Sequence, residues 1–502
     1  MTSTTVISPV TRLEGHLGIR LEVNDGRVTD AFCSGEMFRG FEIILKGRDP
    51  LDAQQITQRI CGVCPVSHGM ASVLAQEDAY GITPPENGRI ARNIILAANY
   101  IQSHIIHFYH LSALDFIDIT AVTKYQGKDP VLNGVKQWVL AEISSGKIFP
   151  AAPFLPRFEG NYVENTEINI SAIKHYLEAL EMRADAHKLA ALFCGKIPHI
   201  ATLVPGGITE KITAVKIAAA DSLLTRLEQF IDNAYLQDVV TVAGAFPSYF
   251  ENGRGPGNFL SYGVFRTKND AGRFLPQGVI IDGKTETLQP SVITEDIGYA
   301  YYNSDSGLSP GSGRTIPEPN KHNAYSWLKA PRYKGYPMEV GPLARILIAY
   351  NKGESAITTA VDQLLGKIDR KPAELVSVMG RHAARALECK LVAVKCREWI
   401  DQLRPDMPTA TPFIIPDSGS GTGLTEAPRG ALGHWLTLKN QKIENYQCVV
   451  PTTWNCSPKD DTGKPGPVEK ALIGSPIKDR ENPIEAMRIV RSFDPCLACA
   501  VH

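Results

Sequence analysis

Residues 59–65 read RICGVCP, and residues 494–502, at the other end of the chain, read DPCLACAVH. Each stretch holds a CxxC pair, whose two-residue spacer lets both sulfurs point at one metal centre. Four thiolates brought together form a site for a soft metal. Nearly the whole chain separates the two pairs, so only the completed fold, and no local hairpin, can close such a site.

Several kinds of site fit four cysteines. A structural zinc site usually gathers its ligands within a short stretch to hold a small module together. Disulfides would require an oxidising scaffold, of which the sequence gives no sign. A catalytic metal held by four thiolates fits the spacing best. His68 lies four residues after Cys64, one turn on if a helix starts near Pro65. We expect His68 to donate a hydrogen bond to a ligating sulfur.

The composition is that of an ordinary globular protein, with 502 residues, 43% hydrophobic and 21% charged. A formal net charge of -1 gives no basic field for nucleic acid. The N-terminus lacks the basic start and apolar run of a signal peptide, and no apolar stretch is long enough for a membrane span. We therefore expect a soluble, untargeted chain. The cysteines outside the two pairs are scattered and are predicted to be small buried hydrophobes: Cys33, Cys194, Cys389, Cys396, Cys448 and Cys456.

The apolar pattern predicts mostly helices. Residues 16–23 alternate apolar and polar and end in Asn24-Asp25-Gly26, which predicts a β-hairpin. The loop SGSGTG at 418–423 resembles a phosphate cradle but lacks the required strand and helix around it, so a flexible loop is predicted. Helical spacing is clear after Pro84 and over about 171–196, 210–237, 354–367 and 372–403.

We predict a single domain of mainly α class with peripheral β structure (α+β). Its regions are a β-hairpin region (5–50), a helical body (53–237 and 354–403), an irregular β-containing excursion (240–345) and a C-terminal region that closes the active site (410–502), together covering 1–502.

Further motifs accompany the two cysteine stretches in a fixed order. They are RLEGH at 12–16, FRGFE at 38–42, HFYH at 107–110, EAPRG at 426–430 and VVPTTW at 449–454. Together with RICGVCPxxH and DPCxxCxxH they resemble the large catalytic subunit of [NiFe] hydrogenases. The resemblance is to the periplasmic uptake group, close to the selenium-containing [NiFeSe] branch. Cys496 stands where that branch carries selenocysteine, so we expect a sulfur-ligated site in a long-helix bundle that the N- and C-terminal CxxC pairs close.

The resemblance implies a role for each cysteine. Cys61 and Cys496 would be terminal ligands of nickel, and Cys64 and Cys499 would bridge nickel to an iron that carries one CO and two cyanides. The implied reaction is reversible heterolytic cleavage of H2, which needs a base for the proton. Cys496 would accept that proton first, and Glu14 would relay it onward.

The same resemblance places Arg429 over the open face of the metals, where a fixed cation polarises H2. Asp494 would pair with Arg429 or with nearby groups. Many relatives carry an aspartate where this chain has Ser103, so a carboxylate partner for Arg429 is missing on that side. The CO and cyanide ligands would sit in a pocket formed by Pro428, Leu432, Val450, Pro451 and Thr452, with hydrogen bonds from Thr452 and Arg429.

A second metal site is implied near the end of the chain. The ring of His502, the carboxylate of Glu42 and the backbone carbonyl of Cys448 match the family's buried magnesium site, where Fe²⁺ can replace Mg²⁺. An ending at His502 is expected either of a matured product or of a gene that lacks the usual removable tail.

No further cysteine cluster is left to bind an iron–sulfur centre. The implied partner is an iron–sulfur small subunit, in a heterodimer or a dimer of heterodimers. The electrons would then reach a c-type (c3-type) cytochrome or a ferredoxin. The small subunit carries the export signal in this family, so a periplasmic location is expected, membrane-associated only through partners, with a cytoplasmic location as the alternative.

Three other functions compete with the catalytic one. A quinone-reducing subunit of the complex I type shares the ancestry but lacks the four cysteines. An H2-sensing regulatory hydrogenase often replaces the histidine found here as His68. A zinc-stabilised scaffold without catalysis predicts zinc and no H2 chemistry.

Overall fold

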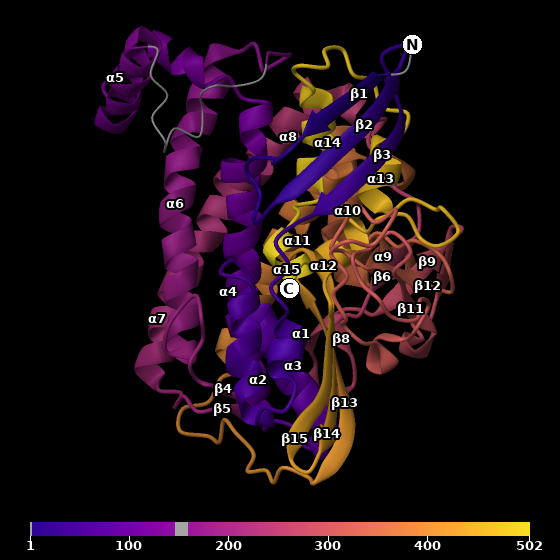
Figure 1. The fold of residues 1–502 in the computed structure, drawn as a ribbon. Coiled ribbons are helices and arrows are strands. Elements are labelled where there is room, and N and C mark those ends of the chain that lie inside the picture. Colours follow the sequence, from indigo (N-terminus) through magenta and orange to yellow (C-terminus); the bar gives the residue numbers. More distant parts are fainter. Residues whose placement is uncertain (1–2, 146–158) are drawn as a thin grey trace.

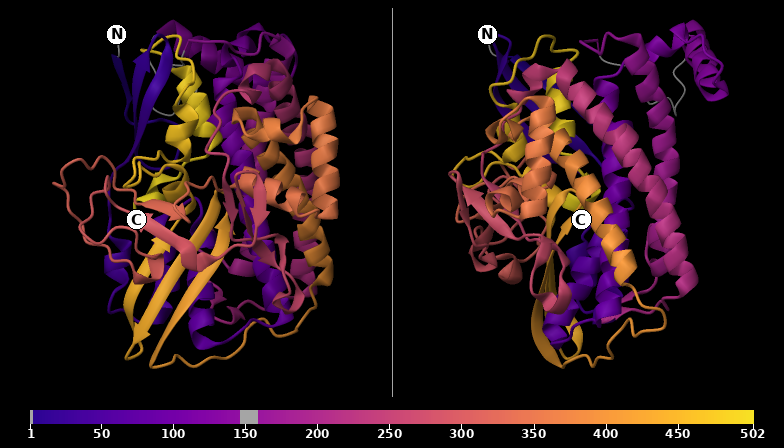
Figure 2. Two further views of the ribbon diagram at one scale, coloured as in Figure 1. Left: turned by 90° about the vertical axis from the view of Figure 1, so that its right-hand side faces the viewer. Right: turned by 180° about the vertical axis from the view of Figure 1, so that it is seen from behind.

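Long helices form the body of the computed structural model, which describes residues 3–145 and 159–502. The helices α4 (Glu86–Ile106) and α6 (Thr166–Cys194) pack along each other, and α11 (Val378–Gln402) packs against α4 (Figure 1). The apolar positions of α4 recur at helical spacing and are buried, as the sequence predicted. Seen from behind, the long helices run roughly parallel, and the sheets lie to one side of them (Figure 2).

The other helices complete this body or cover its ends. Two π-type turns interrupt it, at His107–Ser112 after α4 and at Ile231–Tyr235 between α7 and α8. The remaining helices are α1 (Phe41–Leu45), α2 (Pro50–Thr57), α3 (Pro65–Tyr80), α5 (Pro130–Ser145), α7 (Ala214–Phe230), α8 (Leu236–Ala245), α9 (Pro342–Asn351), α10 (Ser355–Ile368), α12 (Pro451–Asn455), α13 (Pro467–Leu472), α14 (Ile484–Ser492) and α15 (Leu497–Ala500).

The predicted N-terminal hairpin is confirmed and gains a third strand. The strands β1 (Ser3–Ile7), β2 (Leu17–Asn24) and β3 (Arg27–Gly35) form an antiparallel sheet in that order. Asp25 and Gly26 both have positive φ, as a tight turn between twisted strands requires. The alternate apolar residues of β2 are buried, which fixes its register.

The region 240–345, where the sequence predicts an irregular β-containing excursion, holds short strands and loops. The strands lie in separate small sheets, ordered β10–β9–β6, β7–β8 and β11–β12. The first and third of these sheets contribute to a second apolar cluster, whereas β7 and β8 pack on the main core. The short strands of this region are β6 (Phe259–Ser261), β7 (Val264–Arg266), β8 (Arg273–Leu275), β9 (Gly278–Ile281), β10 (Lys284–Glu286), β11 (Ile293–Asp296) and β12 (Ala330–Tyr333). Before this region, β4 (Leu203–Val204) pairs with β5 (Gly207–Ile208).

The flexible loop predicted at 418–423 is wrong. These residues begin β13 (Ser418–Ala427), which pairs with β14 (Gly430–Lys439); β14 also pairs with β15 (Lys442–Val449). The face of β13 lies against α3, and its glycines permit this close approach. A Cβ on Gly423 would lie 2.0 Å from the carbonyl oxygen of Ala71 on that helix. The glycines therefore mark a sheet that touches a helix backbone, which a turn-rich composition conceals.

The end of the chain lies inside the molecule (Figure 1). Leu497 N donates to the carbonyl of Glu14 (2.7 Å), and Gly40 N donates to the carbonyl of His502 (3.2 Å). Both contacts join the last residues to the first forty or so. The two ends of the chain therefore pack against each other, as a site formed by the two separated cysteine pairs requires.

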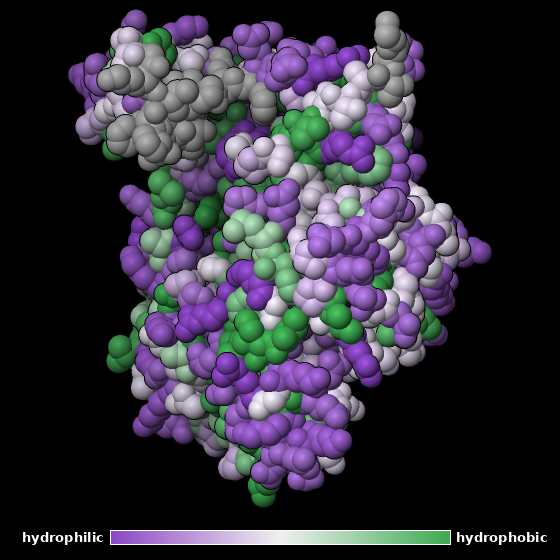
Figure 3. Space-filling view, in the orientation of Figure 1, coloured by the Kyte–Doolittle hydropathy of each residue, from purple (hydrophilic) through white to green (hydrophobic). Residues whose placement is uncertain are grey.

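Exposed apolar side chains gather on and before α1 and at the start of α2. Met37 is 62% exposed, Ile43 46%, Ile44 42% and Leu51 43%. The space-filling view shows hydrophobic residues over the lower centre of this face (Figure 3), where Figure 1 places α1 and α2. Of the described helices, none has the length and apolar character needed to cross a membrane.

Candidate metal centre

The structure brings the four cysteines of the CxxC pairs together. Cys61 Sγ lies 3.4 Å from Cys496 Sγ, and Cys64 Sγ lies 3.1 Å from Cys499 Sγ. Cys496 Sγ and Cys499 Sγ are also 3.1 Å apart, and all four sulfurs lie within 4.8 Å of one another. All four thiols are free and at most 3% exposed. A buried set of four converging sulfurs has the donor chemistry of a soft-metal centre.

Local structure aims each pair at the same point. Pro65 begins α3, as predicted, so Cys64 occupies the cap position of that helix. The backbone N–H of Val63 points back at Cys61 Sγ (3.2 Å). In the second pair, Cys496 N donates to Thr452 Oγ1 (2.9 Å), and Cys499 follows within α15. The conformation of each pair is therefore fixed by the backbone around it.

Glu14 lies directly beside the thiols. Its Oε2 is 3.2 Å from Cys496 Sγ and accepts a hydrogen bond from Ala498 N (3.1 Å). Burial raises the pKa of Glu14, and the nearby charge of Cys61 raises it further. Both effects favour the protonated form of this carboxyl.

Arg429 is buried against Asp494 and also lies near the thiols. The guanidinium Nη2 lies 3.0 Å from Asp494 Oδ1, and Nε donates to the Asp494 carbonyl (3.1 Å). A weaker contact joins Nη1 to Ser103 Oγ (3.4 Å), at the position where a carboxylate partner was expected to be missing. Burial opposes the charge of Arg429, but Asp494 and the nearby cysteines outweigh burial and raise the pKa further. Arg429 is thus a fixed cation.

His68 lies one turn into α3, but its hydrogen bond differs from the prediction. Its Nδ1 lies 3.2 Å from His434 Nε2, and within residues 3–145 and 159–502 no hydrogen bond joins its ring to a cysteine sulfur. Burial lowers the pKa of His68 to about 3, so the ring is neutral. His434 was not found from the sequence, because it belongs to none of the motifs.

The predicted pocket residues are all buried: Pro428, Leu432, Val450, Pro451 and Thr452. Of these, Thr452 is tied to the centre through Cys496 N. The carbonyl of Pro428 accepts from Arg345 Nη2 (2.8 Å), an arginine that also binds Glu388 and Glu426. Contact of the five residues with diatomic ligands stays a prediction.

A second group of possible metal ligands lies nearby. Atoms of Glu42, Cys448 and His502 lie within 4.8 Å of one another. Glu42 Oε1 is 3.2 Å from His502 Nε2 and accepts from Cys448 N (2.7 Å). The sulfur of Cys448 belongs to this group, whereas the sequence analysis used its carbonyl. Burial would raise the pKa of Glu42, but Lys329 and His502 outweigh it and lower the pKa to about 2.

Other candidates lie elsewhere. His104, His107 and His110 bond to Glu388 (2.9 Å), to the Arg491 carbonyl (2.7 Å) and to the Tyr176 carbonyl (3.1 Å), so they are packed histidines. The six scattered cysteines are buried and free, as predicted.

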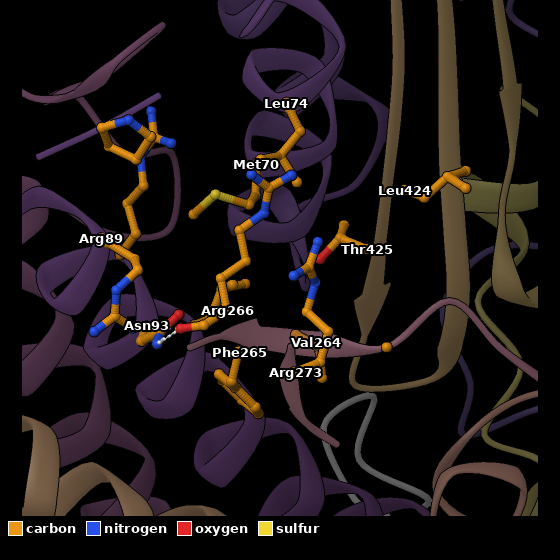
Figure 4. A pocket seen from close by; sticks show the side chains of 14 residues that line it. Met70, Leu74, Arg89, Asn93, Val264, Phe265, Arg266, Arg273, Leu424 and Thr425 are labelled. Carbon is orange, nitrogen blue, oxygen red and sulfur yellow. Dashed lines mark hydrogen bonds between the residues drawn. The ribbon is translucent and has the colours of Figure 1, made fainter. Parts of the chain in front are cut away.

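A separate pocket lies between α3, α4 and β13 (Figure 4). Its floor carries Arg266, whose carbonyl accepts from Asn93 (3.0 Å, dashed in Figure 4). Four arginines line it, and each has an acidic partner: Arg89 with Glu86, Arg92 with Glu77, and Arg266 and Arg273 with Asp270. None of the predicted site residues lines this pocket.

A family model described as nickel-dependent hydrogenase matches residues 39–502, and one described as HoxL-like matches residues 4–34. The chain belongs to the nickel-dependent hydrogenase family. It is 43% identical to the periplasmic [NiFeSe] hydrogenase large subunit of Desulfomicrobium baculatum, over 99% of this chain and 94% of that protein. It is 36% identical to the hydrogenase-1 large chain of Escherichia coli K12, with the same coverage.

Solved structures agree. The [NiFeSe] hydrogenase of Dm. baculatum superimposes with a TM-score of 0.88 at 42% identity and covers 100% of both chains, and that of D. vulgaris Hildenborough does so at 41% identity. As a hydrogenase large subunit, the chain is an oxidoreductase that acts on H2 with nickel and pairs with a small subunit. The predicted family, fold class and function are therefore confirmed.

Proposed function

We propose that the four-thiol centre of this hydrogenase large subunit holds nickel and iron, with Cys61 and Cys496 on nickel alone and Cys64 and Cys499 shared with iron. The observation that carries this assignment is the convergence of four buried sulfurs with a carboxyl and a guanidinium beside them. When bound, the metal pair, whose iron would carry one CO and two cyanides, supplies the Lewis acidity and electron acceptance that split H2.

The protein's own groups take the proton. Cys496 Sγ is the first acceptor, and Glu14 Oε2, 3.2 Å away, receives the proton from it. The raised pKa of Glu14 favours its protonated state, and the bond from Ala498 N holds its carboxyl in place. Glu14 is partly exposed, so it can pass the proton outward.

Arg429 acts through its charge. Asp494 and Ser103 hold the guanidinium by contacts on different nitrogens, so it cannot reorient when charge develops beside it. Pro428, Leu432, Val450 and Pro451 supply apolar walls for the diatomic ligands. Thr452 and Arg429 supply donors to the cyanide nitrogens.

The second site is proposed to hold Mg²⁺ or Fe²⁺. The carboxylate of Glu42 stays charged because its pKa is about 2, and oxygen ligands with several waters suit Mg²⁺. A thiol at Cys448 and the ring of His502 favour Fe²⁺ more than an all-oxygen site would. Metal analysis of the purified protein distinguishes the two ions.

The small subunit is proposed to bind over the exposed apolar residues of α1 and α2. Glu42 and the Arg39 contact to the Ile60 carbonyl (2.7 Å) connect this face directly to both candidate metal sites. The small subunit would carry the iron–sulfur clusters and pass electrons to a c-type cytochrome or a ferredoxin. Since a relative is described as periplasmic, we propose that the heterodimer works in the periplasm.

An infrared spectrum of the purified heterodimer tests the metal assignment. One CO band and two cyanide bands that shift under H2 are expected. A sample that contains zinc and shows none of these bands would refute the assignment and favour a scaffold. Bands that respond to H2 without turnover would instead favour the H2-sensing alternative.

A further inference from the structure

The side chain of Arg345 uses all five of its N–H groups on buried acceptors. Nε donates to Glu388 Oε2 (2.7 Å), and Nη2 donates to Glu388 Oε1 (2.6 Å) and to the carbonyl oxygen of Pro428 (2.8 Å). Nη1 donates to Glu426 Oε2 (2.7 Å) and to the carbonyl oxygen of Ala427 (3.1 Å). Arg345, Glu388 and Glu426 are all 0% exposed. A planar guanidinium that is bound at every N–H and shielded from water has a single orientation.

Two of these acceptors belong to the turn that carries Arg429. Ala427 pairs with Gly430 at the end of the β13–β14 ladder, so Pro428 and Arg429 form a two-residue turn between the strands. The Pro428 carbonyl belongs to the peptide group whose nitrogen is that of Arg429. Because this group is planar, a hydrogen bond to its oxygen fixes the backbone on the N-terminal side of Arg429.

The C-terminal side of Arg429 is held by the start of α9. Arg345 lies in the first turn of this helix, and its backbone N–H donates to the carbonyl of Gly341 at the helix cap (3.0 Å). A Cβ on Gly341 would lie 2.9 Å from the carbonyl oxygen of Arg429, so the helix cap packs directly on the turn. The start of α9 therefore contacts the peptide groups on both sides of Arg429.

The carboxylate that holds Arg345 also binds α4. Burial would raise the pKa of Glu388, but the charge of Arg345 outweighs burial and lowers the pKa to about 2, so the group is a carboxylate that only accepts hydrogen bonds. His104 Nε2 lies 2.9 Å from Glu388 Oε1 and is the donor. His104 directly follows Ser103, whose Oγ lies 3.4 Å from Arg429 Nη1. Glu388 therefore connects the backbone of the turn with the helix that touches the guanidinium of Arg429.

We propose that Arg345 is a positioning residue for Arg429, which holds the turn in the conformation that directs the guanidinium of Arg429 to the four-thiol centre. Asp494 and Ser103 bind the far end of the Arg429 side chain. Arg345 fixes the backbone from which that side chain starts. This consequence for catalysis rests on the proposed function of Arg429, whereas the placement of the side chain does not.

A crystal structure of the Arg345→Lys heterodimer tests the placement directly. Lysine presents its three N–H donors on a single nitrogen, so it cannot bind Glu388 and both turn carbonyls at once. The Arg429 side chain is expected to move and to lose the 3.0 Å contact between its Nη2 and Asp494 Oδ1. An Arg429 side chain that stays in its wild-type position would overturn the proposal. This measurement does not depend on catalysis.

Arg92→Lys is the matched control. Arg92 is 4% exposed, pairs with Glu77 (2.7 Å) and donates to the carbonyls of Val204 (2.6 Å) and Gly207 (2.9 Å), so it also joins a carboxylate to backbone carbonyls. The Arg429 side chain should keep its position in this variant. An equal movement in both variants would show a general loss of packing and would overturn the positioning role.

Tyr100→Phe provides a second variant in case Arg345→Lys does not fold. The Tyr100 hydroxyl lies 2.9 Å from the carbonyl oxygen of Glu426 and 3.1 Å from that of Ala427, and its removal leaves the ion pairs of the network intact. A smaller movement of the Arg429 side chain is expected. Its wild-type position in this variant would show that contacts to the turn carbonyls do not place Arg429, and would overturn the proposal.

Turnover of the double variant Arg345→Lys/Arg429→Lys tests the consequence for catalysis. Arg345→Lys alone is expected to lower kcat by up to about 10²-fold, as a displacement of about 1 Å can. Added to Arg429→Lys, it should cost little more, because the group that it positions has already been changed. Losses that multiply in the double variant would mean that the residues act independently, and would overturn the positioning role. Absence of CO and cyanide bands from the wild type would instead count against the proposed function and leave the placement to the crystal structure.

Discussion

The two candidate metal sites lie side by side and differ in almost every property. The first has four sulfurs supplied as two CxxC pairs, whereas the second has single residues, Glu42, Cys448 and His502. They are joined through Cys499, whose carbonyl lies 2.9 Å from His502 Nδ1. Soft donors select nickel and iron, and a carboxylate selects a harder ion. Two neighbouring sites can therefore hold different metals, because the type of donor atom, and not the location of the site, selects the metal.

The cations beside the two sites differ as well. Arg429 is held at the thiol centre by contacts on separate nitrogens, as a planar guanidinium allows. Lys329, at the second site, lies 3.7 Å from Glu42 and 3.5 Å from Glu295 and acts as a single point charge. An arginine held in one orientation, such as Arg429, can stabilise charge that develops in a reaction. A lysine such as Lys329 can neutralise buried carboxylates without a fixed orientation. We infer that the first site is reactive and the second is structural.

Replacement of a thiol should produce the largest difference in metal content between the two sites. Cys499→Ser exchanges a soft donor for a hard one, so we expect complete loss of nickel and of H2 oxidation while the second site keeps its ion. Metal analysis and an H2-uptake assay measure both. Cys194→Ser is the control, since this buried thiol donates to the Lys196 carbonyl and serine can keep that bond. Full nickel content in Cys499→Ser would contradict the proposed ligand set.

A smaller effect is expected from a residue that touches the first site without binding metal. Glu14→Gln keeps an acceptor for Ala498 N but cannot take a proton, so turnover should fall about 10²–10⁴-fold with both metals retained. The kcat and the metal content are measured together. Glu22→Gln, at a half-buried position of β2 where the carboxylate pairs with Arg20, should change neither. Unchanged turnover in Glu14→Gln would require another proton path.

Arg429→Lys tests the difference between the two cations. Lysine keeps the charge but cannot reach Asp494 and Ser103 at once, so we expect a loss of about 10²–10³-fold in kcat. The infrared bands of the metals should remain. Arg397→Lys, a surface arginine paired with Glu228, is the control. Wild-type turnover in Arg429→Lys would mean that charge alone is sufficient.

The smallest effect on turnover is expected at the second site, where the change should appear in stability. A pKa lowered from 4.5 to about 2 corresponds to roughly 3 kcal/mol of folding free energy from the charged form of Glu42. Because the folded pKa lies below the unfolded one, this contribution is complete above pH 4.5 and is lost as the pH falls to about 2. The difference in unfolding free energy between wild type and Glu42→Gln should shrink over that range.

The matched control for the stability measurement is Glu286→Gln. Glu286 is exposed and paired with Lys334, and such surface pairs contribute about 0–1 kcal/mol. A difference between wild type and Glu42→Gln that does not depend on pH would mean that packing, and not charge, accounts for the effect.

Much of the secondary structure could be predicted from the sequence, because helical spacing and turn residues are local signals. The 3.6-residue spacing after Pro84 predicted α4, and Asp25-Gly26 predicted the turn between β2 and β3. The glycines at 418–423 led to the wrong prediction of a loop, because glycine occurs both in mobile turns and where two backbones approach closely. Only the packing of β13 on α3 decides between these uses.

The sequence by itself indicated which four thiols come together, because each CxxC pair lies within its own contiguous motif. The tertiary structure alone decided which single residues from distant elements lie beside these groups as hydrogen-bond or charge partners. Lys329 beside Glu42 and His434 beside His68 belong to no motif. Their roles come from distances of a few ångströms between residues hundreds of positions apart. Ligand chemistry is encoded locally, whereas the orientation and charge of the ligands are set by packing.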